Sequence, residues 1–282
     1  MNTKRFFSAM KNDKGARHVL IMTATIDPSA FKCNKISTTS CEAIVQLRLI
    51  QYLSAIKFYI QESAFTDIIF VENSLYEFDY KKYEDMAQAV GKTFEYLPMK
   101  LSERQLGFMN IMAKTYGEAL LIDYAMRNGK AVAESDEIYK ITGRVLLKNS
   151  DKIIRCARKG VSEGICIHSV DLLKIFPCCK HYMGYIIQTV FFKVTKADYF
   201  AVLGKDIDYY ENLLATKHGK YLIIERLWYE LAKENRLKIY GFKCYPDLSG
   251  NRGSVDMAYD KNKVGLFFRN ILCKFGYYSL KS

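Results

Sequence analysis

The sequence contains no run of about 18 apolar residues, so we expect no helix that spans a membrane. Its first residues, MNTKRFFSAMKNDKGAR, lack the apolar core and the small-residue cleavage site of a secretory signal. Its eight cysteines form no pair of Cys-x-x-Cys elements with zinc-ligand spacing, and Cys178, Cys179 and His181 have no second ligand cluster. We therefore expect free thiols in the reducing environment of the cytoplasm.

Two nucleotide-binding signatures are also missing. No Gly-x-Gly-x-x-Gly follows the first apolar run, and no Gly-x-x-x-x-Gly-Lys-Ser/Thr occurs. These absences disfavour a dinucleotide-binding fold and a P-loop, so any phosphate must be bound by another device.

Acidic residues are too few to balance the basic ones, because 30 Asp and Glu face 42 Lys and Arg and leave a net charge of +12. The excess suits nucleic acid, an acidic membrane or a phosphorylated small molecule. The basic residues are spread along the chain without a long tract or an aromatic-basic signature, so we expect no nucleic acid partner. Half of the residues are hydrophobic and 14% are aromatic, which predicts a folded chain with a sizeable core.

Short apolar runs alternate with helical patterns over the first half of the chain. We predict buried strands at 19–23, 67–71, 93–97 and 138–141, and helices at 41–61 and 117–128, the second ending at Gly129. We place no helix between the second and third strands. This order predicts an α/β fold whose mostly parallel sheet is covered by helices.

Polar residues follow these strands, and ligands of such sheets bind at the carboxyl ends of the strands. We expect Thr23 and Thr25 to line a base pocket and Glu72 to accept hydrogen bonds from a ribose or base. We expect the neighbouring Asn73 to contact the same ligand. The alternative is that these residues only close turns.

The segment SDEIYKITGR places cationic, hydroxyl and glycine residues together at the end of the fourth strand. Lys140 and Arg144 supply positive charge, Thr142 supplies a hydroxyl, and Gly143 exposes backbone N–H groups, all of which suit phosphate oxygens. A solvated turn is the alternative, because such short patterns recur by chance.

Four stretches, TATIDP, VENS, YGEALLIDYAM and SDEIYKITGR, together resemble bacterial glycosyltransferases from surface-polysaccharide gene clusters. The resemblance runs from about Arg17 to Ser254. It implies a GT-A-like single domain that binds a nucleotide-sugar donor and transfers its sugar to an acceptor glycan of a capsule or lipopolysaccharide. Gly117 and Glu118 are then expected to begin a helix whose N–H groups face the donor, or to be a loop residue and a first-turn charge.

The usual GT-A signature, an Asp-x-Asp at a strand end that holds a divalent metal, is absent from the expected place. Asp136 and Glu137 precede the strand instead of following it. We expect Lys140 or Arg144 to replace part of the metal's charge, because a guanidinium can bind two phosphate oxygens at once. We therefore assign no metal ligand and leave the cofactor open.

Glu225, which follows an apolar run, is the expected catalytic base that removes the acceptor's hydroxyl proton. The alternative is an exposed helical glutamate paired with Arg226 or Lys220. The weaker candidates are Glu230, His168 and His218.

We divide the chain into an N-terminal extension at 1–16, the transferase domain at 17–260 and a basic amphipathic tail at 261–282. At 100° per residue the tail's apolar side chains fall on one face, namely Val264, Phe267, Phe268, Ile271, Leu272 and Phe275. This pattern predicts a helical C-terminal region that lies on the anionic lipids at the inner face of the cytoplasmic membrane, near a lipid-linked acceptor. Alternatively, the stripe faces the domain's own core.

Two functions of other classes also fit the sequence. One is a nucleotidyltransferase that acts on a sugar phosphate, and the other is a non-catalytic basic protein that binds a membrane or nucleic acid. Turnover of a nucleotide-sugar separates the transferase from both.

Overall fold

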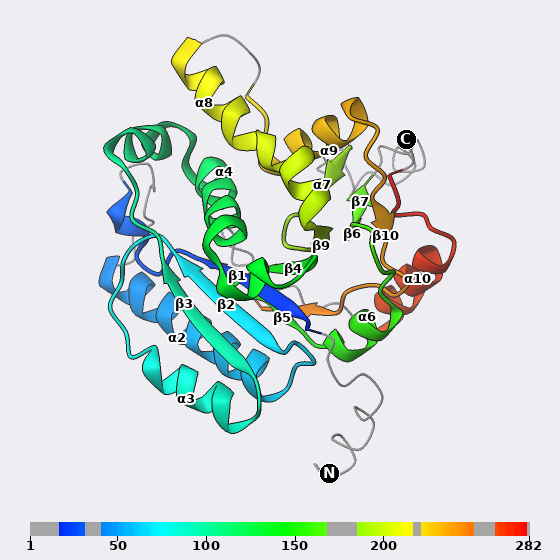
Figure 1. Ribbon diagram of the computed structural model, residues 1–282, viewed down its shortest axis with the longest axis horizontal. Coiled ribbons are helices and arrows are strands. Elements are labelled where there is room, and N and C mark those ends of the chain that lie inside the picture. Colours follow the sequence, from blue (N-terminus) through cyan, green and yellow to red (C-terminus); the bar gives the residue numbers. More distant parts are fainter. Residues whose placement is uncertain (1–16, 32–40, 168–184, 217–220, 251–262, 281–282) are drawn as a thin grey trace.

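The computed structural model describes residues 17–31, 41–167, 185–216, 221–250 and 263–280 (Figure 1). The predicted N-terminal extension therefore lies outside the described residues. So do His168, His218 and the cluster of Cys178, Cys179 and His181. The predicted domain boundaries stay predictions.

A seven-stranded sheet forms the centre of the molecule, in the order β10-β6-β9-β4-β1-β2-β3. Its strands are β1 (Val19–Ala24), β2 (Asp67–Glu72), β3 (Thr93–Pro98), β4 (Glu137–Thr142), β6 (Glu163–Gly164), β9 (Phe191–Thr195) and β10 (Tyr240–Gly241). The first four run parallel, whereas β9 is antiparallel to β4 and β6 is antiparallel to β9.

Helices cover both faces of this sheet (Figure 1). One face carries α2 (Cys41–Gln61) and α3 (Lys81–Ala89), and the other carries α4 (Glu103–Asn128), α8 (Asp206–Thr216) and α9 (Ile224–Glu234). Alternate residues of β1 serve the two cores, because successive strand side chains point to opposite faces: Val19 and Ile21 enter one, Leu20 and Met22 the other.

Smaller elements complete the described chain. They are η1 (Pro28–Ala30), α5 (Lys130–Ala133), β5 (Leu146–Leu147), α6 (Ser150–Cys156), β7 (Cys166–Ile167), β8 (Ile186–Ile187), α7 (Lys196–Ala201), η4 (Leu203–Lys205), β11 (Leu248–Ser249) and α10 (Lys263–Lys274). None of the helices that the structure describes is long and apolar enough to cross a membrane. The predicted fold class is confirmed, with its mostly parallel, helix-covered sheet and its helical C-terminal region.

Two helix predictions need correction. The α3 helix, which we did not predict, lies between β2 and β3, because parallel neighbours need a crossover connection. The α4 helix begins at Glu103, where Ser102 Oγ accepts a hydrogen bond from Gln105 N at 3.2 Å and Gln105 Oε1 accepts one from Ser102 N at 3.0 Å. Gly117 and Glu118 thus lie inside α4, and the prediction that they begin a helix is wrong.

The end of the described chain packs beside the short edge strands. Leu280 N donates to Ile239 O at 2.7 Å, and Cys166 N donates to Tyr278 O at 3.0 Å. The side chains of Tyr278 and Leu280 are buried. Tyr278 and Leu280, which follow α10, are therefore part of the domain's core.

Asp206 is a fully buried carboxylic acid at the start of α8. Its Oδ2 accepts a hydrogen bond from Trp228 Nε1 at 2.7 Å, which joins α8 to α9. Burial raises the pKa of Asp206 from 3.8 to about 7, although the Trp228 hydrogen bond opposes the rise.

This raised pKa predicts a specific dependence of stability on pH. The folded state holds the Asp206 proton more tightly than the unfolded state, so the free energy of unfolding falls as pH rises from about 4 to about 7. The decrease should approach about 1.4 kcal/mol per pH unit, the free energy that corresponds to one pKa unit. Asp206→Asn stays neutral, so its free energy of unfolding should lack this fall. Above pH 7 the variant should therefore be more stable relative to the wild type than it is at low pH. Urea unfolding across this pH range measures the difference, and parallel curves for both proteins would contradict the assignment.

Candidate functional site

The polar residues that follow β1, β2 and β4 meet at the carboxyl edge of the sheet. Thr25 Oγ1 donates to Asn73 Oδ1 at 2.7 Å, which joins the loops after β1 and β2. Gly143 N donates to Thr23 O at 2.9 Å, which joins the turn after β4 to β1. The structure therefore brings together the three strand ends that the sequence singled out.

Glu72 holds two of these loops in place. Its buried carboxylate accepts hydrogen bonds at Oε1 from Ile26 N at 3.0 Å and Ser74 N at 2.9 Å, and at Oε2 from Tyr76 N at 3.3 Å. These bonds satisfy backbone donors that no strand partner can reach. Glu72 thus positions the site, while its predicted contact with a ribose or base stays a prediction.

Asn73 presents a buried donor at the centre of this edge. The residue is 4% exposed, and its Nδ2 has no hydrogen-bond partner among the residues that the structure describes. Gly117 of α4 lies opposite, where an added Cβ would stand 3.9 Å from Asn73 Nδ2 and 2.8 Å from Met109 Sδ. A buried N–H without a partner is costly, so this amide is suited to a ligand's acceptor atom.

Two guanidinium groups lie on the α2 side of the edge. Arg48 Nε donates to Thr25 O at 2.9 Å, and Arg144 Nη1 donates to Gln51 Oε1 at 2.9 Å. Tyr52 lies with them, since its hydroxyl accepts from Thr25 N at 3.1 Å and its ring centroid is 5.7 Å from the Arg144 guanidinium carbon. Burial lowers the pKa of Arg144, and the neighbouring charge of Arg48 acts in the same direction. Two cations on the same side of this edge suit a doubly charged anion such as a diphosphate.

Lys140 points to the other face of the sheet, toward α4. Its buried ammonium forms an ion pair with Glu118 and donates to Thr189 O at 2.7 Å and to Thr142 Oγ1 at 3.4 Å. Its charge is therefore met within the protein, and Lys140 and Arg144 do not form one cationic cluster. The predicted contacts of Lys140, Glu118 and Thr142 with a donor stay predictions.

Glu225 lies in the first turn of α9, near this ion pair. Burial raises the pKa of Glu225 and the Glu118 carboxylate adds to the rise, while the charges of Lys114 and Lys140 oppose it. The fold thus holds Glu225 beside Glu118 and Lys140, which makes it more easily protonated than an exposed glutamate.

The expected alternative for Glu225 involved pairing with Arg226. In the structure Arg226 pairs instead with Glu230, one turn further along α9. Lys220, the other expected partner, lies outside the described residues.

The described residues contain no group of three or more His, Cys, Asp or Glu side chains that could hold a metal ion. The sequence does contain Asp206-Ile207-Asp208, but this triplet lies in α8 and not at a strand end. Asp206 is buried against Trp228, and Asp208 is exposed. The cofactor stays open.

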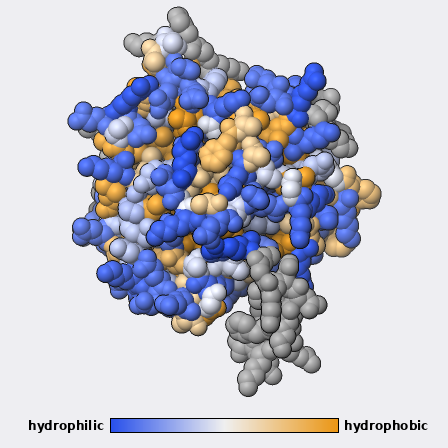
Figure 2. All heavy atoms as spheres, in the orientation of Figure 1, coloured by the Kyte–Doolittle hydropathy of each residue, from blue (hydrophilic) through white to orange (hydrophobic). Residues whose placement is uncertain are grey.

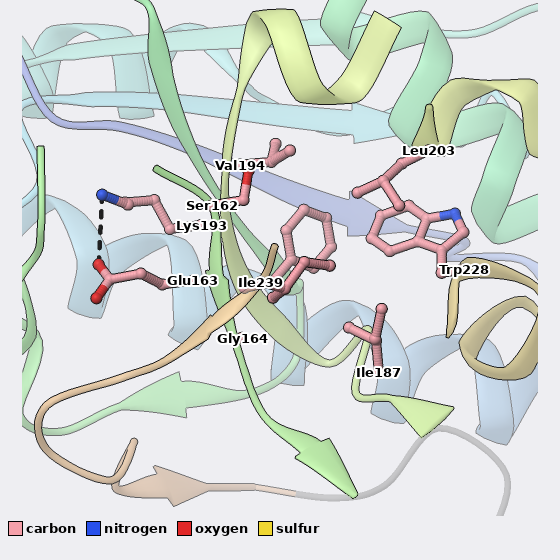
Figure 3. Close-up of a pocket in the computed structure, with 10 residues that line it drawn as sticks. Ser162, Glu163, Gly164, Ile187, Lys193, Val194, Leu203, Trp228 and Ile239 are labelled. Atoms are coloured by element: carbon pink, nitrogen blue, oxygen red, sulfur yellow. Dashed lines mark ion pairs between the residues drawn. The ribbon is translucent and has the colours of Figure 1, made fainter. Parts of the chain in front are cut away.

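A Gly-x-Ser-x-Gly pattern runs from Gly160 to Gly164, and Figure 3 labels its Ser162, Glu163 and Gly164. In α/β-hydrolases this pattern exposes a serine on a turn between a strand and a helix. Here Ser162 is buried, its Oγ donates to Asp198 Oδ2 at 2.6 Å and accepts from Thr195 N at 3.2 Å. The strand β6 follows it, so the pattern is structural and does not indicate a hydrolase.

The surroundings of Ser162 support a structural role (Figure 3). Lys193 Nζ lies 3.3 Å from a carboxylate oxygen of Glu163, and both side chains are buried. Arg158 Nη1 lies 2.7 Å from the other Glu163 oxygen. The adjoining cavity, beside Trp228, has a volume of about 10 Å³, which is room for one water at most.

Comparisons with known proteins give distant similarities only. The chain matches no protein-family model and no curated protein. Among solved structures it is similar to the mannosyltransferase Ktr4p from S. cerevisiae in complex with GDP, at 10% identity and a TM-score of 0.46, over 95% of this chain and 83% of that one.

Two further solved structures show similarity of the same kind. The galactosyltransferase LgtC in complex with donor and acceptor sugar analogs has 11% identity and a TM-score of 0.42, over 76% of this chain and 70% of that one. A UDP-glucose pyrophosphorylase complexed with UDP-glucose has 12% identity and a TM-score of 0.38, over 93% and 99%. Because similarity this low does not carry function, we base the function on the site itself.

The turn at Gly143 gives a test of how closely the site is packed. A Cβ at this position would stand 2.8 Å from Thr23 O and 3.0 Å from the Tyr52 ring, so Gly143→Ala should lower the free energy of unfolding by about 1–3 kcal/mol. Gly107→Ala is the matched control, because a Cβ there meets nothing within 4 Å and should stabilise α4 by about 0.5–1 kcal/mol. Urea unfolding of both variants measures this. Equal effects of the same sign would show that the turn is not closely packed.

Proposed function

We propose that the protein is a GT-A-like glycosyltransferase that binds a nucleotide-sugar donor at the carboxyl edge of β1, β2 and β4. The observation that carries this proposal is the pair of guanidinium groups, Arg48 and Arg144, beside the hydrogen-bonded Thr25 and Asn73. The guanidinium groups would hold the diphosphate and stabilise the charge that develops as it leaves. The Asn73 amide would serve the ribose or base.

Glu225 would act as the base in this mechanism. As the bond between the sugar and the diphosphate breaks, an acceptor hydroxyl attacks the sugar carbon and Glu225 takes the hydroxyl proton. Its raised pKa suits this role, because a stronger base accepts a proton more readily near neutral pH. The ion pair between Lys140 and Glu118 would keep these two charges beside Glu225 neutralised by each other.

The acceptor belongs to a bacterial surface polysaccharide in this proposal. The support is the resemblance of the TATIDP, VENS, YGEALLIDYAM and SDEIYKITGR segments to glycosyltransferases of capsule and lipopolysaccharide gene clusters. The enzyme would work in the cytoplasm, where nucleotide-sugars are its donors.

Donor binding is tested first by a thermal-shift screen of nucleotides and nucleotide-sugars, since a ligand of the native state raises its stability. For the donor so found, Arg144→Ala and Arg48→Ala should each weaken binding by about 1.5–3 kcal/mol, the range for charged hydrogen bonds. Arg155→Ala is the control, because Arg155 lies on α6 in an exposed pair with Asp151. Unchanged donor binding in folded Arg144→Ala and Arg48→Ala proteins would remove the diphosphate site from this edge.

Catalysis is tested with Glu225→Gln. This variant should lose turnover by about 100-fold or more, the usual contribution of a general base, while its donor affinity stays the same. The wild type should lose activity on acidification at a pH above the usual range of a glutamate, because the pKa of Glu225 is raised. Glu230→Gln, five residues further along α9, is the matched control and should keep its turnover.

The products of the same assay decide the reaction class. A glycosyltransferase releases the nucleoside diphosphate. Release of pyrophosphate would instead identify a nucleotidyltransferase.

Full activity of Glu225→Gln would show that Glu225 is not the base of the mechanism.

A further inference from the structure

Helix α10 and the turn that follows it leave large apolar side chains in solvent. Phe267, Phe268 and Phe275 expose 63%, 60% and 81% of their surface, and Leu272 exposes 37%. We call these four residues the aromatic face. Figure 2 shows hydrophobic atoms at the right-hand edge of the molecule, where Figure 1 places α10. Apolar side chains gathered in this way on a surface mark an interaction site.

The aromatic face is not the side by which α10 packs on the domain. Leu266 and Cys273 pack against the core on the α2 face of the sheet, and Asn270 Oδ1 accepts a hydrogen bond from Tyr245 N at 2.9 Å. These contacts fix the helix with its aromatic face outward. The alternative in which the predicted stripe faces the core is therefore wrong for the phenylalanines, while the side chain of Val264 lies outside the described residues.

Basic side chains adjoin the aromatic face. Lys152 of α6, Lys243 and Lys274 line a groove of about 380 Å³ that includes Phe267. The sequence contains no acidic residue from Lys261 onward. Apolar and cationic groups thus share one surface.

We propose that α10 docks the protein on an anionic lipid bilayer, with the aromatic face in the interfacial layer and the groove lysines against lipid phosphates. Phenylalanines on a short helix enter the boundary between headgroups and acyl chains, and lysines beside them are attracted to anionic headgroups. This inference goes beyond the proposed function and does not rest on it, since docking uses no residue of the sheet edge. In a transferase, it would bring the enzyme to acceptors carried on a lipid.

A second copy of the chain is the other occupant that the exposed face admits. A symmetric pair of aromatic faces places the same surface opposite itself, so the groove lysines of the two copies would approach each other. An anionic bilayer supplies the opposite charge instead. The charge of this surface therefore favours lipid over self-association.

The full-length protein is tested by co-sedimentation with vesicles of phosphatidylcholine and phosphatidylglycerol in equal parts. We expect binding that weakens at high salt and is much lower on pure phosphatidylcholine. The triple variant Phe267→Ser/Phe268→Ser/Phe275→Ser should lose affinity by about tenfold or more. Lys243→Glu/Lys274→Glu should bind less and lose the salt dependence. Substitution is preferable to truncation, because Tyr278 and Leu280 belong to the core.

The matched control replaces three apolar residues of similar exposure on α2 and α4, in the variant Leu47→Ser/Ile50→Ser/Ile111→Ser. It should bind vesicles as the wild type does, and thermal unfolding confirms that each variant is folded. The proposal is overturned if the phenylalanine variant keeps its affinity, or if the control loses as much. A dimer in sedimentation without vesicles that the phenylalanine substitutions abolish would assign the face to a second copy.

Discussion

The buried carboxylate of Glu72 is the interaction on which the functional edge depends. Strand ends leave backbone N–H groups that the sheet does not satisfy, and Glu72 accepts hydrogen bonds from three of them in the loops after β1 and β2. Asp27 N also donates to Ser74 Oγ at 3.0 Å, which extends the same network. With both loops fixed, Thr25 and Asn73 meet, and Arg48 can reach the Thr25 carbonyl from α2. The polar edge is thus built from one strand-end acid outward.

The elements with strong local signals were predictable from the sequence. The strands β1 to β4 are short apolar runs that end in turn residues, and α2 has the bounds that we predicted. The missed elements carry weaker signals. The start of α4 is indicated only by the capping pair Ser102 and Gln105, a short local signal. The strand β9 is buried throughout, but Lys193 interrupts its apolar run, so the sequence does not show the continuous apolar pattern of a buried strand.

The site was predictable where it follows from topology and not where it depends on distant pairing. The carboxyl ends of parallel strands meet at one edge of the sheet, so the sequence alone predicts that Thr25, Asn73 and Gly143 lie close together. Arg48 and Tyr52 lie on a helix, where polar residues are usually solvated, and no spacing tied them to β1. Likewise, the partner of Lys140 is Glu118 on another element, and burying such a charge depends on that partner. A pairing of this kind is set by the packing of α4 on the sheet.

The hydrogen bonds that join Cys166 to Tyr278 and Ile239 to Leu280 also determine the order in which parts of the chain can fold during synthesis. The strands β1 to β4 are complete once Thr142 has left the ribosome. The two hydrogen bonds form only after Leu280, 138 residues later, has been synthesised. At the usual rate of synthesis this interval is on the order of 10 s. The carboxyl ends of β1, β2 and β4, where Glu72 lies, can therefore form well before the contacts of Cys166 and Ile239 with the residues after α10. The nascent chain would gain its polar edge first and its aromatic surface last.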